Sequence, residues 1–175
     1  MTEIVKIPQE RIKILIGEAG HNKKLIETKC KVKLEIDSEG DVEIEGDTTE
    51  EFFAKDVVKA IGRGFGMKES LMLIEQDYNL YIISLKDFVN SDKAITRLKG
   101  RVIGESGKMK NDIELATESY LSIYGSTIGI IARLDTLEYA KEAVSMLLDG
   151  APHSTVINYL AKAKREILDG HLKMR

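Results

Sequence analysis

Apolar and polar residues follow the same order of periods twice along the chain. In the first half, residues 4–7 predict a strand, and residues 12–16 place apolar side chains on one face of a helix. A second helical pattern follows, after which alternation over residues 32–36 and 42–44 predicts two half-buried strands. Residues 53–61 return to the helical period. The predicted order is therefore strand, helix, helix, strand, strand, helix.

The second half repeats this order at a nearly constant offset. Residues 121–123 match residues 34–36 at an offset of 87, and residues 139–141 match residues 53–55 at an offset of 86. The difference is one residue, lost in the turn at residues 125–126. A constant offset with one loop deletion indicates two copies of one structural unit.

A Gly-x-x-Gly motif separates the first two predicted helices in each copy, as Gly-Glu-Ala-Gly at residues 17–20 and Gly-Glu-Ser-Gly at residues 104–107. Glycine suits this corner because a side chain would block the approach of a sugar–phosphate backbone and because some positions need a positive φ. The N–H groups that begin the following helix attract a phosphate. The motif therefore predicts a nucleic-acid contact at each corner.

This order of elements matches the type I KH domain, a module that binds about four unpaired nucleotides in a groove beside the Gly-x-x-Gly loop. The sequence predicts an α+β fold of two tandem type I KH domains, each β-α-α-β-β-α. We place the first domain at residues 1–75 and the second at residues 79–175, which ends in an additional C-terminal helix. The expected helix N-caps are Thr48 or Thr49, Ser91 or Asp92, and Ser154.

Charge separates the two copies. The chain is globular in composition, with 43% hydrophobic and 31% charged residues and a net charge of −3. Residues 1–79 hold 12 Lys and Arg against 17 Asp and Glu, whereas residues 80–175 hold 14 against 12. The electrostatic field therefore favours RNA at the second copy.

The second loop has the more favourable flanks, since Ser106 can donate a hydrogen bond to a phosphate and several cations lie nearby. Glu105 opposes this and lowers the expected affinity. The expected RNA-binding residues are Arg97, Lys99, Arg101, Val102, Ile103, Gly104, Glu105, Ser106, Gly107, Lys108 and Lys110. A weaker RNA site, or a protein-docking site, is expected in an acidic setting at Ile16, Gly17, Glu18, Ala19, Gly20, Lys23 and Lys24.

Two further segments have open interpretations. Tyr120 and Tyr124 either stack on bases or pack against the sheet, and strand aromatics more often pack. Residues 62–66 (Gly-Arg-Gly-Phe-Gly) form either a small RNA-binding loop or, as we favour, the end of a helix and the start of a linker.

Other classes of protein find little support. No apolar stretch approaches the ~20 residues of a membrane span, no secretory signal pattern opens the chain, and Cys30 is the single cysteine, which together favour the cytoplasm. His21, His153 and His171 lack partners at metal-ligand spacing. We therefore expect no catalytic residue, metal or cofactor, and a carboxylate-based nuclease is a less favoured alternative.

Three segments carry a family resemblance: residues 60–65 (Ala-Ile-Gly-Arg-Gly-Phe), 85–87 (Leu-Lys-Asp) and 99–108 (Lys-Gly-Arg-Val-Ile-Gly-Glu-Ser-Gly-Lys). With them the chain resembles the archaeal two-KH-domain pre-ribosomal RNA processing proteins, the archaeal counterparts of the eukaryotic partner-of-Nob small-subunit assembly factor. The resemblance implies a non-enzymatic protein that holds the single-stranded 3′ region of small-subunit rRNA during processing. It also implies two partners, the endonuclease that trims this rRNA and the alpha subunit of initiation factor two.

An alternative follows from the acidic first copy and from the glutamate in both loops. In this alternative the KH units form a protein-interaction scaffold in ribosome assembly or translation initiation, with little RNA affinity of their own.

Overall fold

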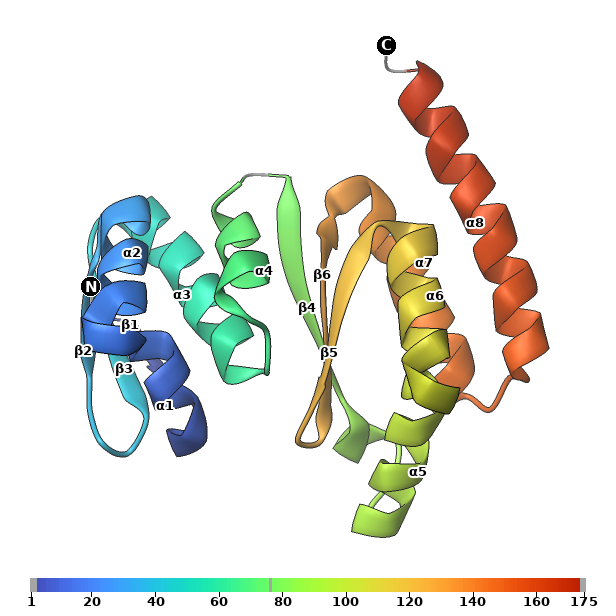
Figure 1. The fold of residues 1–175 in the computed structure, drawn as a ribbon, viewed down its shortest axis with the longest axis horizontal. Coiled ribbons are helices and arrows are strands. Elements are labelled where there is room, and N and C mark those ends of the chain that lie inside the picture. Colours follow the sequence, from blue (N-terminus) through green and yellow to red (C-terminus); the bar gives the residue numbers. More distant parts are fainter. Residues whose placement is uncertain (1–2, 76, 174–175) are drawn as a thin grey trace. The chain divides into compact units, whose positions relative to one another are not determined.

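The computed structural model describes residues 3–75 and 77–173 (Figure 1). The chain divides into two compact units, Met1–Leu80 and Tyr81–Arg175. Residues 1–2 and 174–175, which the expected domain ranges include, lie outside the described part.

The first unit is a three-stranded sheet with helices on one face (Figure 1). The strand order is β1-β3-β2 with antiparallel pairing, which places Val5 opposite Val42 and Leu34 opposite Ile44. The elements are β1 (Glu3–Lys6), α1 (Gln9–Ile16), a 3₁₀ turn (Glu18–Gly20), α2 (His21–Cys30), β2 (Lys33–Ile36), β3 (Asp41–Glu45), α3 (Thr48–Gly62), α4 (Met67–Leu71) and a 3₁₀ turn (Met72–Ile74).

Strand alternation decides which face of this sheet the helices cover. Leu34 is fully buried between the exposed Lys33 and Glu35, as the period of two predicts. The apolar faces of the helices complete the core with fully buried Leu15, Ile26, Val57 and Ile61. The hydrophobic pattern alone therefore fixes the orientation of the sheet.

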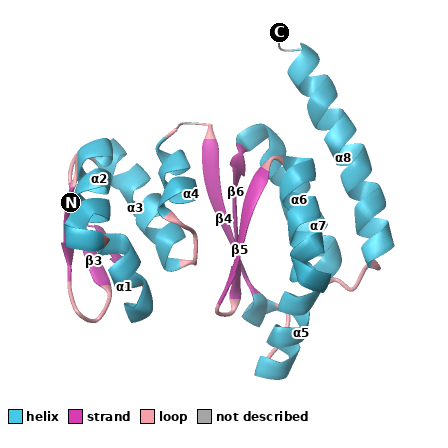
Figure 2. Ribbon diagram, in the orientation of Figure 1, coloured by secondary structure: helices cyan, strands magenta, loops and turns pink. Residues whose placement is uncertain are grey.

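The second unit repeats the architecture, with strand order β4-β6-β5 and helices on one face (Figure 2). Its core joins the sheet to the helices through residues such as Val102, Ile113, Ile130 and Val144. The elements are β4 (Tyr78–Ser84), a 3₁₀ turn (Leu85–Asp87), α5 (Asp92–Ile103), a 3₁₀ turn (Glu105–Gly107), α6 (Lys108–Thr117), β5 (Ser119–Tyr124), β6 (Thr127–Arg133), α7 (Leu134–Leu148) and α8 (His153–Lys173). Strand β4 begins three residues before the boundary between the units and pairs within the second sheet.

Helix α8 packs on α6 and α7 of the same unit. Its buried side chains, Val156, Leu160, Ala163 and Ile167, recur at intervals of four, three and four residues, which places them on one helical face. The expected additional helix is therefore confirmed.

The starts of the helices show which local predictions hold. Ser91 caps α5, where its hydroxyl accepts a hydrogen bond from the Ala94 amide at 3.2 Å. The prediction of Thr48 or Thr49 as a cap is wrong, because α3 begins at Thr48 and Asp47 occupies the N-cap position. Ser154 lies inside the first turn of α8, which begins at His153, so that prediction is also wrong.

Residues 62–66 end α3 and turn the chain, as we favoured. The helix ends at Gly62, where a Cβ atom would lie 2.6 Å from the Ile7 side chain. Gly64 has a φ of 96°, and Phe65 is buried. A helix of five residues, α4, then follows, and it is too short for its period to be read from the sequence.

Cys30 provides a test of this packing. Burial raises the pKa of its thiol from 9.0 to about 11, and the charge of Lys29 only partly offsets this. The thiolate is the reactive form, so at pH 8 we expect iodoacetamide to modify the folded protein roughly 100-fold more slowly than the unfolded chain. Equal rates in buffer and in denaturant would contradict the burial.

The same pKa shift affects stability at high pH. Because the folded state holds the thiol proton more tightly, unfolding releases that proton between pH 9 and about pH 11. The contribution of Cys30 to the free energy of unfolding is therefore complete below pH 9 and is lost as the pH rises through this window.

Candidate nucleic-acid interface

The two Gly-x-x-Gly loops have the same backbone conformation. The first glycines have φ values of 72° and 73°, and the last glycines have φ values of 77° and 78°. Between them, Ala19 and Ser106 both adopt a φ of 52°, in the left-handed region that residues with side chains rarely enter. Three left-handed positions within four residues turn one helix sharply into the next.

The two glycines of each loop have different roles. A Cβ atom on Gly104 would lie 2.8 Å from the Met109 amide nitrogen, and one on Gly17 would lie 2.6 Å from the Asn22 side chain. These first glycines are therefore required for the loop to close on the following helix. A Cβ atom on Gly107 would meet nothing within 4 Å, so this glycine leaves an open surface at the start of α6.

This open surface lies at the N-terminus of a ten-residue helix. Gly107 is the N-cap residue of α6, and no side chain caps the helix. The first amides of such a helix lack intrahelical partners and carry the positive end of the helix dipole. A phosphate group that approaches Gly107 meets both these amides and the exposed Lys108.

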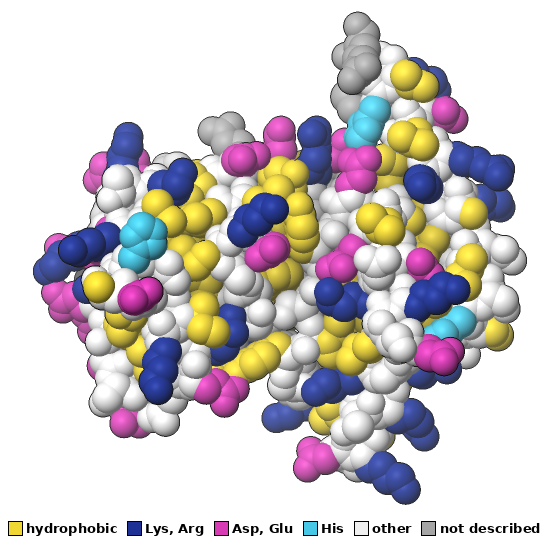
Figure 3. All heavy atoms as spheres, in the orientation of Figure 1, with side chains coloured by type: hydrophobic (Ala, Val, Ile, Leu, Met, Phe, Trp, Pro, Cys, Tyr) yellow, Lys and Arg dark blue, Asp and Glu magenta, His cyan; other side chains and the backbone are white. Residues whose placement is uncertain are grey.

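Lys and Arg side chains gather around α5 and its end (Figure 3). Arg97 and Lys108 are exposed and Lys99 is half-exposed. Glu105 is also exposed, in the first variable position of the loop. The surface at this corner is therefore cationic with one opposing carboxylate.

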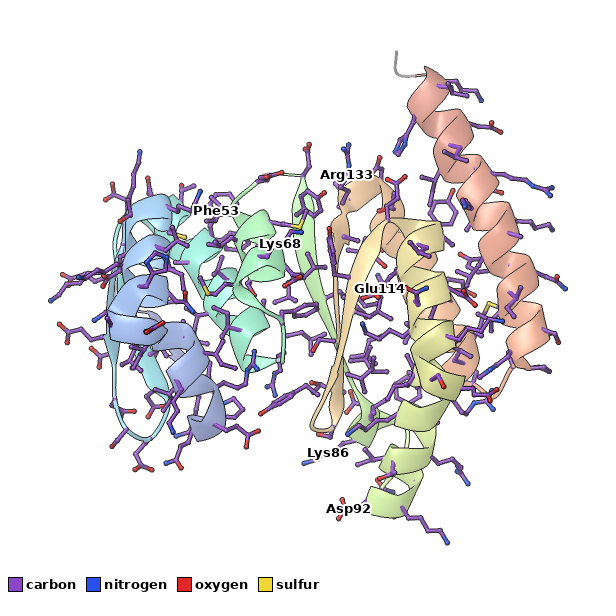
Figure 4. All side chains as sticks on the ribbon, in the orientation of Figure 1. Phe53, Lys68, Lys86, Asp92, Glu114 and Arg133 are labelled. Atoms are coloured by element: carbon purple, nitrogen blue, oxygen red, sulfur yellow. The ribbon has the colours of Figure 1, made fainter. Side chains whose placement is uncertain are left out.

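Lys110 has a role that the sequence analysis did not anticipate. Its ammonium lies 3.1 Å from Oε1 of Glu114, and the same oxygen accepts a hydrogen bond from the Leu121 amide at 2.7 Å (Figure 4). The carboxylate thereby ties α6 to β5, an outer strand of the sheet. Lys110 thus neutralises a structural carboxylate as well as adding positive charge beside the loop.

The first unit contains the same arrangement 87 residues earlier. Glu27 accepts a hydrogen bond from the Leu34 amide at 2.9 Å, and Lys23 lies 3.9 Å from that carboxylate. The signal was present in the sequence as a Lys and a Glu four residues apart in both copies, followed by an apolar strand residue.

Arg101, which we expected at the RNA surface, is held within the fold. Its guanidinium donates to the carbonyl oxygens of Leu147 at 2.9 Å and Ala151, where it satisfies the C-terminal end of α7. The sequence does not reveal this role, because the acceptors lie 46 and 50 residues away.

Arg11 does the same in the first unit, donating to Ile61 at 2.7 Å and Phe65 at 2.6 Å. These acceptors match Leu147 and Ala151 at the offset of 86. The arginines themselves do not match, because Arg11 precedes its loop by six residues and Arg101 by three. In each unit an arginine of the helix before the loop thus caps the end of a later helix, α3 or α7. The two arginines stand one helical turn apart in the repeat.

The other expected residues divide by burial. Val102 is fully buried, so the structure corrects its place: it packs in the core and does not reach the RNA surface. Ile103 and Ile16, beside the first glycine of each loop, are half-buried and border the surface. Tyr120 and Tyr124 are half-buried on β5.

The first loop has the shape of the second with a different setting. Glu18, Ala19, His21, Asn22 and Lys24 line a shallow hollow around it. Glu18, His21 and Lys24 are exposed, so the charge of one lysine is balanced by that of one carboxylate. The backbone suits a phosphate, while the net charge gives it little attraction.

The described part of the chain holds no candidate metal site. Within residues 3–75 and 77–173, no three His, Cys, Asp or Glu side chains are grouped so that they could hold a metal ion. No described helix is long and apolar enough to cross a membrane.

A β-α-α-β-β-α unit with a Gly-x-x-Gly corner between its first two helices defines the type I KH domain, and this chain contains two of them. Residues 79–165 match the family described as eukaryotic type KH-domain (KH-domain type I), and residues 2–60 match the KH domain family. The chain belongs to the KH-domain family that includes the pre-rRNA-processing protein Pno1. The expected fold class and family are therefore confirmed.

Two relatives of known sequence match different shares of the chain. A KH domain-containing protein of Methanocaldococcus jannaschii is 44% identical over 170 residues, which are 94% of this chain and 75% of the relative. The pre-rRNA-processing protein pno1 of Aspergillus fumigatus is 33% identical over 113 residues, 62% of this chain. The chain spans 44% of the length of that fungal protein.

Solved structures share the whole fold. Dim2p from Pyrococcus horikoshii is 39% identical with a TM-score of 0.87, covering 93% of this chain and 99% of that one. A complex of a/eIF2alpha, aDim2p and rRNA from the same organism contains a chain that is 39% identical with a TM-score of 0.88, covering 95% of each chain. A protein of unknown function from Aeropyrum pernix is 32% identical with a TM-score of 0.92, covering 99% and 96%.

The two glycines of the second loop are expected to respond differently to alanine. Gly107→Ala should lower the free energy of unfolding by about 1 kcal/mol, the cost of a side chain at positive φ in open space. Gly104→Ala adds a clash with Met109 and should lower it by roughly 2–4 kcal/mol. Urea denaturation measures both values, and a larger loss for Gly107→Ala would contradict these roles.

Arg101 should affect stability more than a neighbouring arginine does. Arg101→Met removes two charged hydrogen bonds from the end of α7 and should lower the free energy of unfolding by about 2–3 kcal/mol. Arg97→Met, at an exposed position of the same helix, serves as the control and should change it by less than about 0.5 kcal/mol. Equal effects in urea denaturation would show that the Arg101 contacts do not support the fold.

Proposed function

We propose that this chain is a single-stranded RNA-binding protein of small ribosomal subunit assembly, which holds the 3′ region of small-subunit rRNA during its processing. The observation that carries the proposal is the open surface at Gly107, where the first amides of α6 have no side-chain cap and the neighbouring Ser106 and Lys108 are exposed. Paired strands would present fewer base edges to this groove, so the proposed ligand is unpaired.

The comparisons support both the ligand and the process. A relative sharing 39% of its residues was solved with rRNA and a/eIF2alpha, and more distant relatives are pre-rRNA-processing proteins. By this similarity we include the alpha subunit of initiation factor two among the proposed partners. The rRNA-trimming endonuclease is a further proposed partner, and a cytoplasmic location is part of the proposal.

Within the chain, we assign the main RNA contact to the second unit. Both loops have the same backbone and a glutamate in the first variable position, so the difference lies in the cations: Arg97, Lys99 and Lys108 accompany the second loop, while Lys24 and Lys23 accompany the first. Lys24 and Lys23 would add only weak attraction at the first loop, because Lys23 lies beside Glu27. The chain acts in this proposal by binding and positioning, without a catalytic step.

Introducing Asp at both variable positions of each loop tests this assignment. Aspartate tolerates the left-handed conformation at Ser106 and Ala19, so both variants should keep their loop geometry. Glu105→Asp with Ser106→Asp places a new carboxylate at the phosphate position and should raise the dissociation constant for RNA at least ~tenfold. The matched variant Glu18→Asp with Ala19→Asp should raise it by less than ~threefold.

Fluorescence anisotropy with a labelled single-stranded oligonucleotide from the 3′ end of small-subunit rRNA measures both constants. Loss of affinity in the first-loop variant alone would reverse the assignment. Failure of the unmodified protein to bind the oligonucleotide would instead favour the protein-interaction scaffold, which the acidic first unit also fits.

A further inference from the structure

Strand β4 forms one edge of the second sheet. It spans seven residues, Tyr-Asn-Leu-Tyr-Ile-Ile-Ser, with no charge and no proline. It stands at the end of the strand order β4-β6-β5, so no described strand pairs with its outer edge. Long uncharged edges readily accept a further strand, and most proteins shorten them or place charges on them.

The corresponding strand of the first unit shows that protection. Strand β1 also stands at the end of its sheet, but it has four residues. It ends in Lys6, whose ammonium lies 3.3 Å from Asp41 on the neighbouring strand. The same position in the fold is thus short and charged in one unit and long and uncharged in the other.

A groove of about 420 Å³ runs beside β4, between this strand, the 3₁₀ turn after it and α7. Its apolar lining includes Ile83 and Leu148, and two aromatic side chains, Tyr81 and Phe88, are 40% and 45% exposed. Exposed aromatic residues beside an open strand edge are typical of surfaces that take an apolar side chain from a partner.

The polar lining of the groove is acidic. Asp87, Glu138 and Glu142 contribute carboxylates, whereas Lys141 is the cation among the lining residues. The Lys141 ammonium lies 2.7 Å from Glu138 and 4.4 Å from the centre of the Tyr81 ring, so its charge is already engaged. The remaining negative charge disfavours a nucleic acid and favours a basic ligand.

We propose that the β4–α7 groove binds an extended, basic segment of a partner protein. The segment adds a strand to the open edge of β4, places an aliphatic side chain between Tyr81 and Phe88, and directs Lys or Arg toward Glu142 and Asp87. Backbone pairing supplies affinity in this mode of recognition, while the pocket and the carboxylates supply specificity. This site does not rest on the proposed RNA function, because its lining contains no residue of the loop at residues 104–107 or of α6.

Two synthetic peptides test the proposal with the ¹⁵N-labelled 175-residue chain. The probe is acetyl-Arg-Val-Leu-Val-Arg-amide, and its control carries Glu in place of both Arg. We expect the basic peptide to shift the amide resonances of residues 78–84 and 138–148 and to leave those of residues 104–110 unchanged. No shift at β4 and α7, or equal shifts with the acidic peptide, would overturn the proposal.

A charge reversal in the groove tests the role of the carboxylates. Glu142→Lys should weaken binding of the basic peptide roughly fivefold, which corresponds to ~1 kcal/mol. Asp169→Lys makes the same charge change at an exposed position of α8 and should leave the affinity unchanged. Equal weakening in both variants would show that the effect comes from the net charge of the protein and not from the groove.

Titration with octauridylate should leave the amide resonances of residues 78–84 unchanged. Shifts of these resonances would assign the groove to nucleic acid instead.

Discussion

The corner between two helices is the constraint on which each unit depends. Helix α5 must end and α6 must begin within four residues, and the first glycine of the loop lies so close to Met109 that no Cβ atom fits between them. This contact sets the angle of α6 against the sheet. The angle in turn brings Glu114 to the Leu121 amide and leaves the first amides of α6 open to solvent. The open surface at the start of α6 is therefore a consequence of how the corner closes.

Two charged side chains near the second loop stabilise the fold and are therefore less available to a ligand. Arg101 satisfies the end of α7, and Lys110 lies against the carboxylate that holds β5. Buried or partly buried hydrogen-bonding groups need such partners, because leaving them unpaired costs about 1–3 kcal/mol each. The positive charge available to a phosphate is correspondingly smaller than the sequence implies, so the backbone amides of α6 carry a larger share of the proposed interaction.

Periodicity predicted the elements and their order because burial on one face of a helix or strand is a local property of the sequence. The repeat also predicted equivalent positions: the loops agree to within a few degrees in φ. The role of Arg101 could not be predicted in this way, because a long side chain reaches acceptors set by tertiary packing and its counterpart Arg11 lies one turn earlier in the repeat. Asp47 and the short helix α4 were missed because a helix start or a single turn carries too little pattern.

The two loops have the same backbone conformation, so this conformation alone does not indicate that a loop binds RNA. In the first unit, Asn22 lies beneath Gly17 and donates to the Ile14 carbonyl at 2.7 Å, so closing the helix corner there already explains the loop conformation. A Gly-x-x-Gly backbone is thus required by the fold whether or not RNA binds. What distinguishes the second loop is the charge around it, together with a hydroxyl in place of the methyl group of Ala19. The assignment of RNA to this loop consequently rests on electrostatics, and a unit can keep the KH shape while its surface comes to suit a different partner.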